Sequence, residues 1–246
     1  MEDDNNLKHI QDALNSLPED FNILEEQIDV EMQLAYFEMA KELRDEHIDE
    51  SLIEQAKVDL YNEQVSIKEK KRLLVKLAGV DDVESFRLIE AYRKEAEGKL
   101  KDWTVLALQE SRMIIQSSLL GEQQVFISTG LGGKEQNIRY FVALIHSDPE
   151  GEFDETQQKL VGSEFQFFLS ESNGELEEIH FEGRFAMAVF LFPLKQNLHS
   201  IFKSFIDECN QYGGFLNEDV IITNVKKLTV EELTEFISKD NHEEED

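Results

Sequence analysis

The stretch VFISTGLGGKEQNIRYFVALI, residues 125–145, marks the point at which the sequence changes character. Before residue 120 the apolar residues recur at the three- and four-residue spacing of amphipathic helices. The runs VFIST and IRYFVALI are short and rich in β-branched and aromatic residues, which is typical of strands. A glycine-rich loop that ends in Lys134 separates these two runs. The stretch therefore predicts a boundary between a helical half and an α+β half.

Residues 121–239 are predicted to form a two-layer α+β domain. The expected order is ββαββαβα, with strands over QQVFIST, IRYFVALI, ELEEIHF, RFAMAVFLF and EDVIITNV, and helices over DETQQKLVGSEFQFFL, NLHSIFKSFIDECNQY and TVEELTEFI. Glu182 and Gly183 are expected to form the two-residue turn between the third and fourth strands. The prediction is thus a mostly antiparallel five-stranded sheet with its helices packed on one face. Residues 240–246 are predicted to be a disordered acidic tail.

Residues 1–120 are predicted to form an acidic, all-helical domain. Segments such as LIEQAKVDLY, RLLVKLAGV and VESFRLIEAY each place their apolar side chains on one stripe of a helix. Ser66 with Glu69, and Asp81 with Glu84, have the spacing of a capping box, in which the first residue accepts an amide proton and the carboxylate reaches back. These pairs therefore predict two helix N-termini.

Part of this half resembles a known repeat. The segment KKRLLVKLAGVDDVESFRLIEAYRKEAEGKLKDWTVLALQESRMII, residues 70–115, is similar to one and a half units of a HEAT-type helical repeat, with the resemblance extending over about residues 66–116. The segment comprises a predicted helix, a turn, a second helix, a glycine-containing loop and a closing helix with the pattern LKDWTVLAL. The resemblance implies a protein-binding surface. A plain helical bundle is the alternative, because a solenoid needs about three units to stand alone.

The charge of the chain limits its partners. With 24 basic and 53 acidic residues the net charge is -29, which argues against non-specific binding to nucleic acid or anionic lipid. Residues 61–120 carry 11 basic and 10 acidic residues, so they form the segment that a negative partner could approach. The candidate partner-binding residues are Lys68, Lys71, Arg72, Lys76 and Arg87. Association with RNA or ribosomes is one interpretation of them, and a solvated helix face is the other.

The glycine-rich loop is the candidate ligand-binding segment, with residues Ser128, Thr129, Gly130, Gly132, Gly133 and Lys134. A nucleotide-binding loop requires G-x-x-x-x-G-K-[ST], in which backbone amides surround the phosphates. Gly133 and Lys134 match the GK pair, but Ser128 replaces the first glycine and Glu135 follows the lysine. Both flanking runs are strands, so we expect the glycines to permit positive φ in a hairpin connection. The alternative is that exposed amides contact an anion or a peptide.

Other reactive side chains are few. Cys209 lies on the apolar stripe of a predicted helix with Phe202 and Phe205, so a buried structural thiol is expected. The six histidines are scattered without ligand spacing, and we predict neither a metal site nor a cofactor. The acidic segment SDPEGEFDE, residues 147–155, departs from a calcium loop because His146 occupies the first ligand position. We interpret Asp154 as a helix N-cap.

These observations lead to one functional hypothesis and two alternatives. The acidic N-terminus, the lack of a bilayer-length apolar segment and the single cysteine predict a cytoplasmic protein. We interpret it as a non-enzymatic adaptor, chaperone-like or regulatory factor that binds a protein partner through an apolar groove on the helical domain. The acidic surface favours a basic partner. The alternatives are a small-molecule or nucleotide-binding sensor or enzyme that uses residues 128–134, and the ribosome- or RNA-associated factor.

Overall fold

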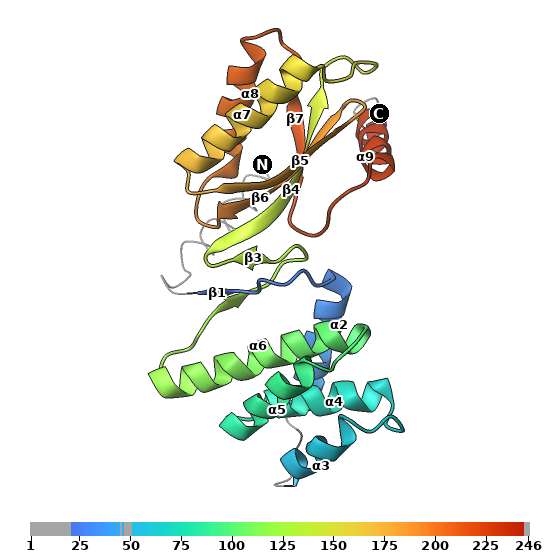
Figure 1. The fold of residues 1–246 in the computed structure, drawn as a ribbon, viewed down its shortest axis with the longest axis vertical. Coiled ribbons are helices and arrows are strands. Elements are labelled where there is room, and N and C mark those ends of the chain that lie inside the picture. The colour runs from blue at the N-terminus through green and yellow to red at the C-terminus, as the bar shows by residue number, and fades with distance from the viewer. Residues whose placement is uncertain (1–20, 45, 47–50, 244–246) are drawn as a thin grey trace. The chain divides into compact units, whose positions relative to one another are not determined.

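The computed structural model describes residues 21–44, 46 and 51–243. These residues divide into two compact units, a helical unit up to Ser128 and an α+β unit from Thr129 (Figure 1). The boundary therefore lies eight residues beyond the predicted one at residue 120. Predictions for residues 1–20 lie outside the described residues. In the described ranges, no helix combines the length and the apolar character of a membrane span.

The helical unit contains five helices among its described residues, framed by two short strands. These elements are β1 (Asn22–Ile23), α2 (Val30–Leu43), α3 (Leu52–Asp59), α4 (Ile67–Ala78), α5 (Val83–Arg93), α6 (Lys99–Leu120) and β2 (Phe126–Ile127). The strand predicted over QQVFIST is reduced to β2, which pairs in parallel with β1 and not with the sheet of the α+β unit. The reason is apolar packing, because Phe126 contacts the helical core and its ring centroid lies 6.5 Å from that of Phe37.

Local hydrogen bonds define the helix starts. The capping box of α4 is confirmed, because the Glu69 amide donates to Ser66 Oγ (3.2 Å) and the Ser66 amide donates to Glu69 Oε2 (3.1 Å). Helix α5 is capped one residue later than predicted. The carboxylate of Asp82, not that of Asp81, accepts the amides of Glu84 (2.7 Å) and Ser85 (3.1 Å). Extended backbone at Asp82 permits this geometry.

The core of the helical unit is built around Trp103 of α6. Its indole N–H donates to the Lys71 carbonyl of α4 (3.1 Å), and its ring meets that of Tyr36 of α2 edge to face at 5.1 Å. Fully buried leucines and isoleucines of α4 and α5 complete the cluster, among them Leu74, Leu77 and Ile89. Burial of each such side chain contributes about 1.5–3 kcal/mol to folding. The first half of α6, which holds most of the buried residues of that helix, therefore lies at the centre of this core.

The α+β unit follows the predicted order. Its elements are β3 (Gly133–Lys134), β4 (Asn137–His146), α7 (Glu155–Glu171), β5 (Glu175–Glu182), β6 (Phe185–Pro193), α8 (Leu198–Asn210), β7 (Leu216–Thr223) and α9 (Val230–Glu243). The first strand of the five is β3, however, which lies within the glycine-rich loop. Helix α9 extends to Glu243, so residues 240–243 are not a disordered tail.

The sheet is antiparallel throughout. Its order is β5-β6-β4, and β3 and β7 pair with successive parts of the remaining edge of β4. Phe141 opposes Val189 on β6 and Thr223 on β7, which places β4 inside the sheet. The turn between β5 and β6 lies one residue later than predicted, because Glu182 still pairs with Phe185 and Gly183 has φ +55°.

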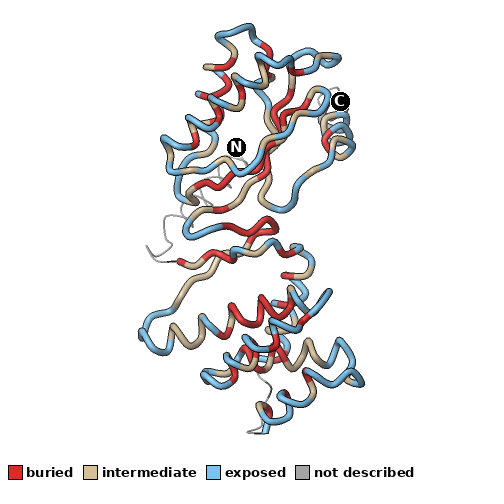
Figure 2. The backbone as a smooth tube through the Cα atoms, viewed as in Figure 1, coloured by how far each residue is buried: buried red, intermediate tan, exposed pale blue. Residues whose placement is uncertain are grey.

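Helices cover both faces of this sheet, which corrects the prediction of one covered face. Buried residues run along β4 and β6 (Figure 2). Val142, Phe190 and Phe192 pack with the phenylalanine-rich helices α7 and α8 on one face. Phe141 and Val189 pack with Leu233 of α9 on the other. The alternation of strand side chains explains why both β4 and β6 are apolar at successive positions.

Candidate protein-binding site

The glycine-rich loop is closed by backbone packing. A Cβ atom added to Gly130 would lie 1.8 Å from the Val225 carbonyl oxygen, so only glycine allows the chain after β7 to approach this closely. The amide of Leu131 donates to the Asn224 carbonyl (3.0 Å) beside this contact. The space next to Gly130 is therefore filled by the unit's own backbone.

The polar groups of the loop bind one another. The Gly132 carbonyl accepts from Thr129 Oγ1 (3.1 Å) and from the Arg139 amide (3.0 Å), and the Gly132 amide donates to the Thr129 carbonyl (3.3 Å). Among the three glycines only Gly132 has positive φ, and the chain reverses later, at Glu135, whose own φ is +55°. The expectation that these glycines together make the hairpin connection is thus wrong for Gly130 and Gly133.

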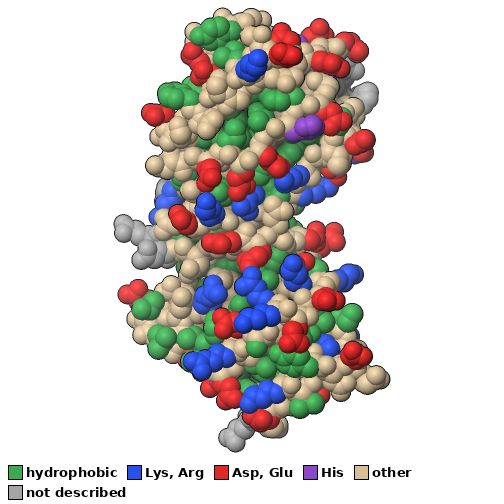
Figure 3. Space-filling model, viewed as in Figure 1, with side chains coloured by type: hydrophobic (Ala, Val, Ile, Leu, Met, Phe, Trp, Pro, Cys, Tyr) green, Lys and Arg blue, Asp and Glu red, His purple; other side chains and the backbone are tan. Residues whose placement is uncertain are grey.

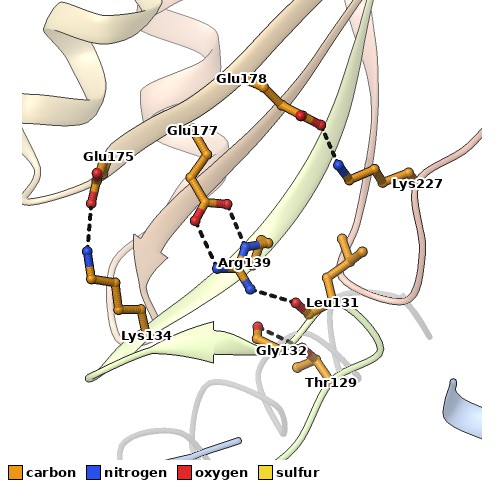
Figure 4. A network of polar contacts seen from close by, with 9 residues as sticks. All are labelled: Thr129, Leu131, Gly132, Lys134, Arg139, Glu175, Glu177, Glu178 and Lys227. Carbon is orange, nitrogen blue, oxygen red and sulfur yellow. Dashed lines mark hydrogen bonds and ion pairs between the residues drawn. The ribbon is translucent and has the colours of Figure 1, made fainter. Parts of the chain in front are cut away.

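Ion pairs connect the loop region to β5 (Figure 4). Arg139 binds both carboxylate oxygens of Glu177, at 2.5 and 2.8 Å, and also donates to the Leu131 carbonyl (2.9 Å). These charge-assisted bonds from Arg139 hold the pKa of Glu177 below its usual value. Lys134 directs its amine to Glu175 at 3.5 Å, away from the loop amides. The lysine predicted to reach a ligand therefore completes this network instead.

The predicted partner-binding residues on α4 and α5 differ in the side chains that they contact. Arg72 and Lys76 both bind Glu46, at 2.9 and 2.7 Å, and they line a hollow of about 460 Å³ between α3 and α4. Lys71 places its amine 3.9 Å from the centre of the Trp103 ring. Each of these three cations has a structural partner. Lys68 lies in the first turn of α4, and Arg87 lies in α5.

The remaining candidates for chemistry are structural. Cys209 is buried in the α8 core, as predicted, and burial raises the pKa of its thiol to about 12. Tyr36 donates to Glu110 at 2.5 Å and links α2 to α6, and burial raises the pKa of both groups. Tyr36 has no exposed surface, so no substrate can reach it. Within the described part of the chain, no group of His, Cys, Asp and Glu could hold a metal ion.

An apolar groove lies between α5 and the C-terminal half of α6. This α5–α6 groove has a volume of about 220 Å³ and is lined by Val83, Phe86, Arg112, Ile115 and Gln116. Helix α6 continues beyond it with leucines that are 80% and 64% exposed, at positions 119 and 120. Hydrophobic side chains gather at this end of α6, at the lower left of Figure 3. Exposed apolar side chains that gather on one face are typical of protein–protein interaction sites.

The length of α6 produces this surface. Burial is concentrated between Trp103 and Ser111, and no residue from Arg112 to Leu120 is buried (Figure 2). Ile115 and Leu119 are four residues apart, so they lie on the same side of the helix. The sequence signal was the apolar run MIIQSSLL, which periodicity alone assigns to a core. Only the tertiary structure shows that Leu119 and Leu120 are exposed.

No protein-family model matches the sequence, and no curated protein matches it. Among solved structures, the chain is similar to the C-terminal segment of the alpha subunit of aIF2 from Pyrococcus abyssi, with 11% identity and a TM-score of 0.25. The match covers 80% of this chain and 99% of that one. A likeness this low carries no argument about fold or function.

Proposed function

We propose that this protein is a non-enzymatic interaction module that binds a protein partner through its helical unit, as an adaptor, chaperone-like or regulatory factor. The observation that carries the proposal is the α5–α6 groove, continued by the exposed leucines Leu119 and Leu120. Grooves of this kind accept the apolar face of a partner helix, whose residues at i, i+3, i+4 and i+7 act as anchors. Burial of these side chains would supply the affinity.

The shape of the site fits a short helical segment. The stretch from Arg112 to Leu119 spans roughly 12 Å along α6, which corresponds to about two turns of a partner helix. The HEAT-like arrangement that we propose for α4, α5 and α6 is supported by the packing of α6 against both other helices in one core. In such repeats neighbouring helices form extended binding surfaces.

Charge would select the partner once apolar contact provides affinity. The net charge of -29 favours a partner whose helix carries basic residues beside its apolar face. Arg112 lies in the wall of the α5–α6 groove and would donate hydrogen bonds to one carboxylate of the partner. The proposed partner is therefore an amphipathic, mostly basic helix with an acidic residue at one position.

Site-specific photocrosslinking in the full chain tests the proposal. A photoreactive phenylalanine analogue at Leu119 is expected to yield discrete adducts in cells, whereas the same analogue at Val58 of α3, which is 64% exposed, serves as the control. Val83→Glu should abolish the adducts, because it puts a charge in the groove. The helix should tolerate this change, since an acidic residue is favourable in the first turn.

Two outcomes would contradict the proposal. One is the same set of adducts from positions 58 and 119, which would show a non-specific apolar surface. The other is an adduct at position 119 that survives Val83→Glu while circular dichroism confirms that the variant is folded. Adducts that are found at 119, absent at 58 and lost with Val83→Glu would support a defined groove.

A further inference from the structure

The α+β unit has a second surface, which is independent of the α5–α6 groove. Strand β7 pairs with β4, and no other described strand pairs with β7. The side chains of Glu218 and Asp219 on this strand are exposed, and those of Val220 and Ile222 are half-buried. A strand edge of this kind offers backbone groups to another extended chain.

The hydrogen-bond pattern shows which groups of β7 are open. The His146 amide donates to the Arg184 carbonyl, and the Arg139 amide donates to the Gly132 carbonyl. Backbone groups alternate in direction along an antiparallel strand, so even-numbered residues of β4 face β6 and odd-numbered residues face β3 and β7. Ile221 opposes Ala143 and therefore binds β4. Val220 and Ile222 direct their N–H and C=O groups away from the sheet.

A hollow lies beside this edge, between β7 and α8. It has a volume of about 420 Å³, and Phe202, Ile206 and Val220 form its apolar part. Phe202 and Ile206 are only 2% and 4% exposed, so the hollow reaches the core of the unit. An extended segment added to β7 would place every second side chain into this hollow.

The charges around the hollow indicate the chemistry of its occupant. The lining includes Asp207, Glu218 and Asp219, while Lys203 and His199 supply the basic side chains. None of the three carboxylates takes part in an ion pair between described residues, and the lining therefore has an excess of negative charge. Asp219 and Val220 are adjacent, so their side chains point to opposite faces of the sheet. Glu218 is two residues from Val220 and shares its face, so each face of the edge carries one acidic side chain beside apolar ones.

We propose that β7 and α8 form a binding site for an extended segment of another protein that contains both apolar and basic residues. The segment would add to the sheet at Val220 and Ile222. Its apolar side chains would fill the hollow over Phe202 and Ile206, and its basic side chains would lie beside Glu218 on that face of the sheet and beside Asp219 on the other. Main-chain hydrogen bonds would provide affinity, and the two faces would provide specificity.

Segments of the protein itself fit this site less well. A second copy would bring the Glu218 and Asp219 side chains of two chains together, which is unfavourable between like charges. Residues 1–20 carry six acidic residues and one basic residue, so they have the wrong charge. The geometry and charge therefore favour a basic partner over self-association.

Fluorescence anisotropy with the full chain tests the site. The probes are two labelled peptides, acetyl-KVKVKVK and acetyl-EVEVEVE, at one salt concentration. We expect the wild type to bind the basic peptide at least about tenfold more tightly than the acidic one, and Glu218→Lys with Asp219→Lys to reverse this preference. The pair Glu150→Lys with Glu152→Lys makes the same change of net charge elsewhere on exposed positions and should preserve the preference.

A backbone variant separates strand addition from simple charge attraction. Val220→Pro removes an N–H group that the sheet does not use, so the fold should persist while binding of the basic peptide weakens by about tenfold. Equal binding by folded Val220→Pro, or equal effects of the two charge-reversal pairs, would overturn the proposal. A concentration-dependent dimer in light scattering that Val220→Pro dissociates would instead identify a second copy as the occupant, and would overturn it too.

Discussion

The glycine-rich loop and the C-terminal end of α6 both differ in structure from what their residue types suggest, but in opposite ways. The loop has the residue types of a ligand site, yet its carbonyls, hydroxyl and lysine are bound to neighbours in the same unit. The end of α6 has the residue types of a core, yet Leu119 and Leu120 are exposed. A surface available for binding is therefore recognised by groups that lack partners, and not by residue type.

The two segments differ in whether residues that are distant in the sequence pack against them. Gly130 is closed by Val225, and Lys134 is paired with Glu175. Ile115, by contrast, lines the groove beside α5, and Leu119 beyond it is exposed. Five substitutions test this comparison, from the largest expected effect on stability to the smallest.

The largest effect is expected for Gly130→Ala. The added methyl group would overlap the Val225 carbonyl oxygen, and the backbone must move to accommodate it. We expect a loss of about 3 kcal/mol or more in the free energy of unfolding, measured with urea. Gly162→Ala in α7 is the matched control, since its Cβ meets no atom within 4 Å and should stabilise the helix slightly. Equal stability of the two variants would show that the loop is open.

Arg139→Ala should have the next largest effect. Its side chain is 15% exposed and joins Glu177 to the Leu131 carbonyl, so its removal leaves both acceptors without their donor. We expect a loss of about 2 kcal/mol by urea unfolding. Lys239→Ala, which removes an exposed ion pair with Glu235 in α9, should change stability by less than about 0.5 kcal/mol. A comparable loss in both variants would contradict a structural role for the Arg139 network.

The contribution of Glu177 should depend on pH. Arg139 lowers its pKa in the folded state below the ordinary 4.5, so the unfolded chain takes up a proton first as pH falls. The stabilisation by Glu177 is therefore complete above that value and is lost as pH falls through the folded pKa. Wild type and Glu177→Gln should differ in stability at pH 7, and the difference should shrink as pH falls below 4.5 and vanish below the folded pKa. A difference that is constant between pH 7 and pH 3.5 would exclude this ion pair as its source.

Lys134→Ala should have a small effect. The amine lies 3.5 Å from Glu175, and both side chains are more than half exposed. We expect a change of less than about 0.5 kcal/mol in unfolding free energy. If anions such as phosphate or ATP stabilise the wild type in thermal unfolding and fail to stabilise Lys134→Ala, the loop binds a ligand and the comparison is broken.

Leu119→Ser should have the smallest effect on stability. The side chain is 80% exposed, so little apolar surface returns to water when it is removed. The midpoint of thermal unfolding should remain that of the wild type, and the free energy should change by less than about 0.5 kcal/mol. A loss of 1 kcal/mol or more would mean that another part of the chain covers Leu119, which would remove the basis for a partner at this surface.

Local sequence signals predicted most of the elements but not their partners. The capping box at Ser66 and Glu69 was recognisable because its two groups are three residues apart. The one-residue error at Asp81 arose because Asp82 has the same chemistry and the adjacent position. The strand over QQVFIST was assigned to the α+β unit, whereas it belongs to the helical unit. An aromatic residue such as Phe126 favours a strand in either unit. Its pairing with Asn22 depends on a residue about 100 positions away.

The candidate sites follow the same rule. The sequence indicated Lys71, Arg72 and Lys76 as basic residues of one helix, and it could not show that Glu46 and the Trp103 ring would bind them. It also predicted an apolar groove on the helical half without locating it. The edge of β7 was invisible, because an edge strand is defined by which strands are absent beside it.

By itself the sequence determined the fold class, the order of the strands and helices in the α+β unit, and the burial of Cys209. These properties follow from periodicity, capping and apolar content, which act over a few residues. The tertiary structure decided that the glycine-rich loop is closed, that both faces of the sheet are covered and that the far end of α6 is exposed. Each of these depends on the distance between groups that are remote in the chain, and that distance is set only when the cores pack.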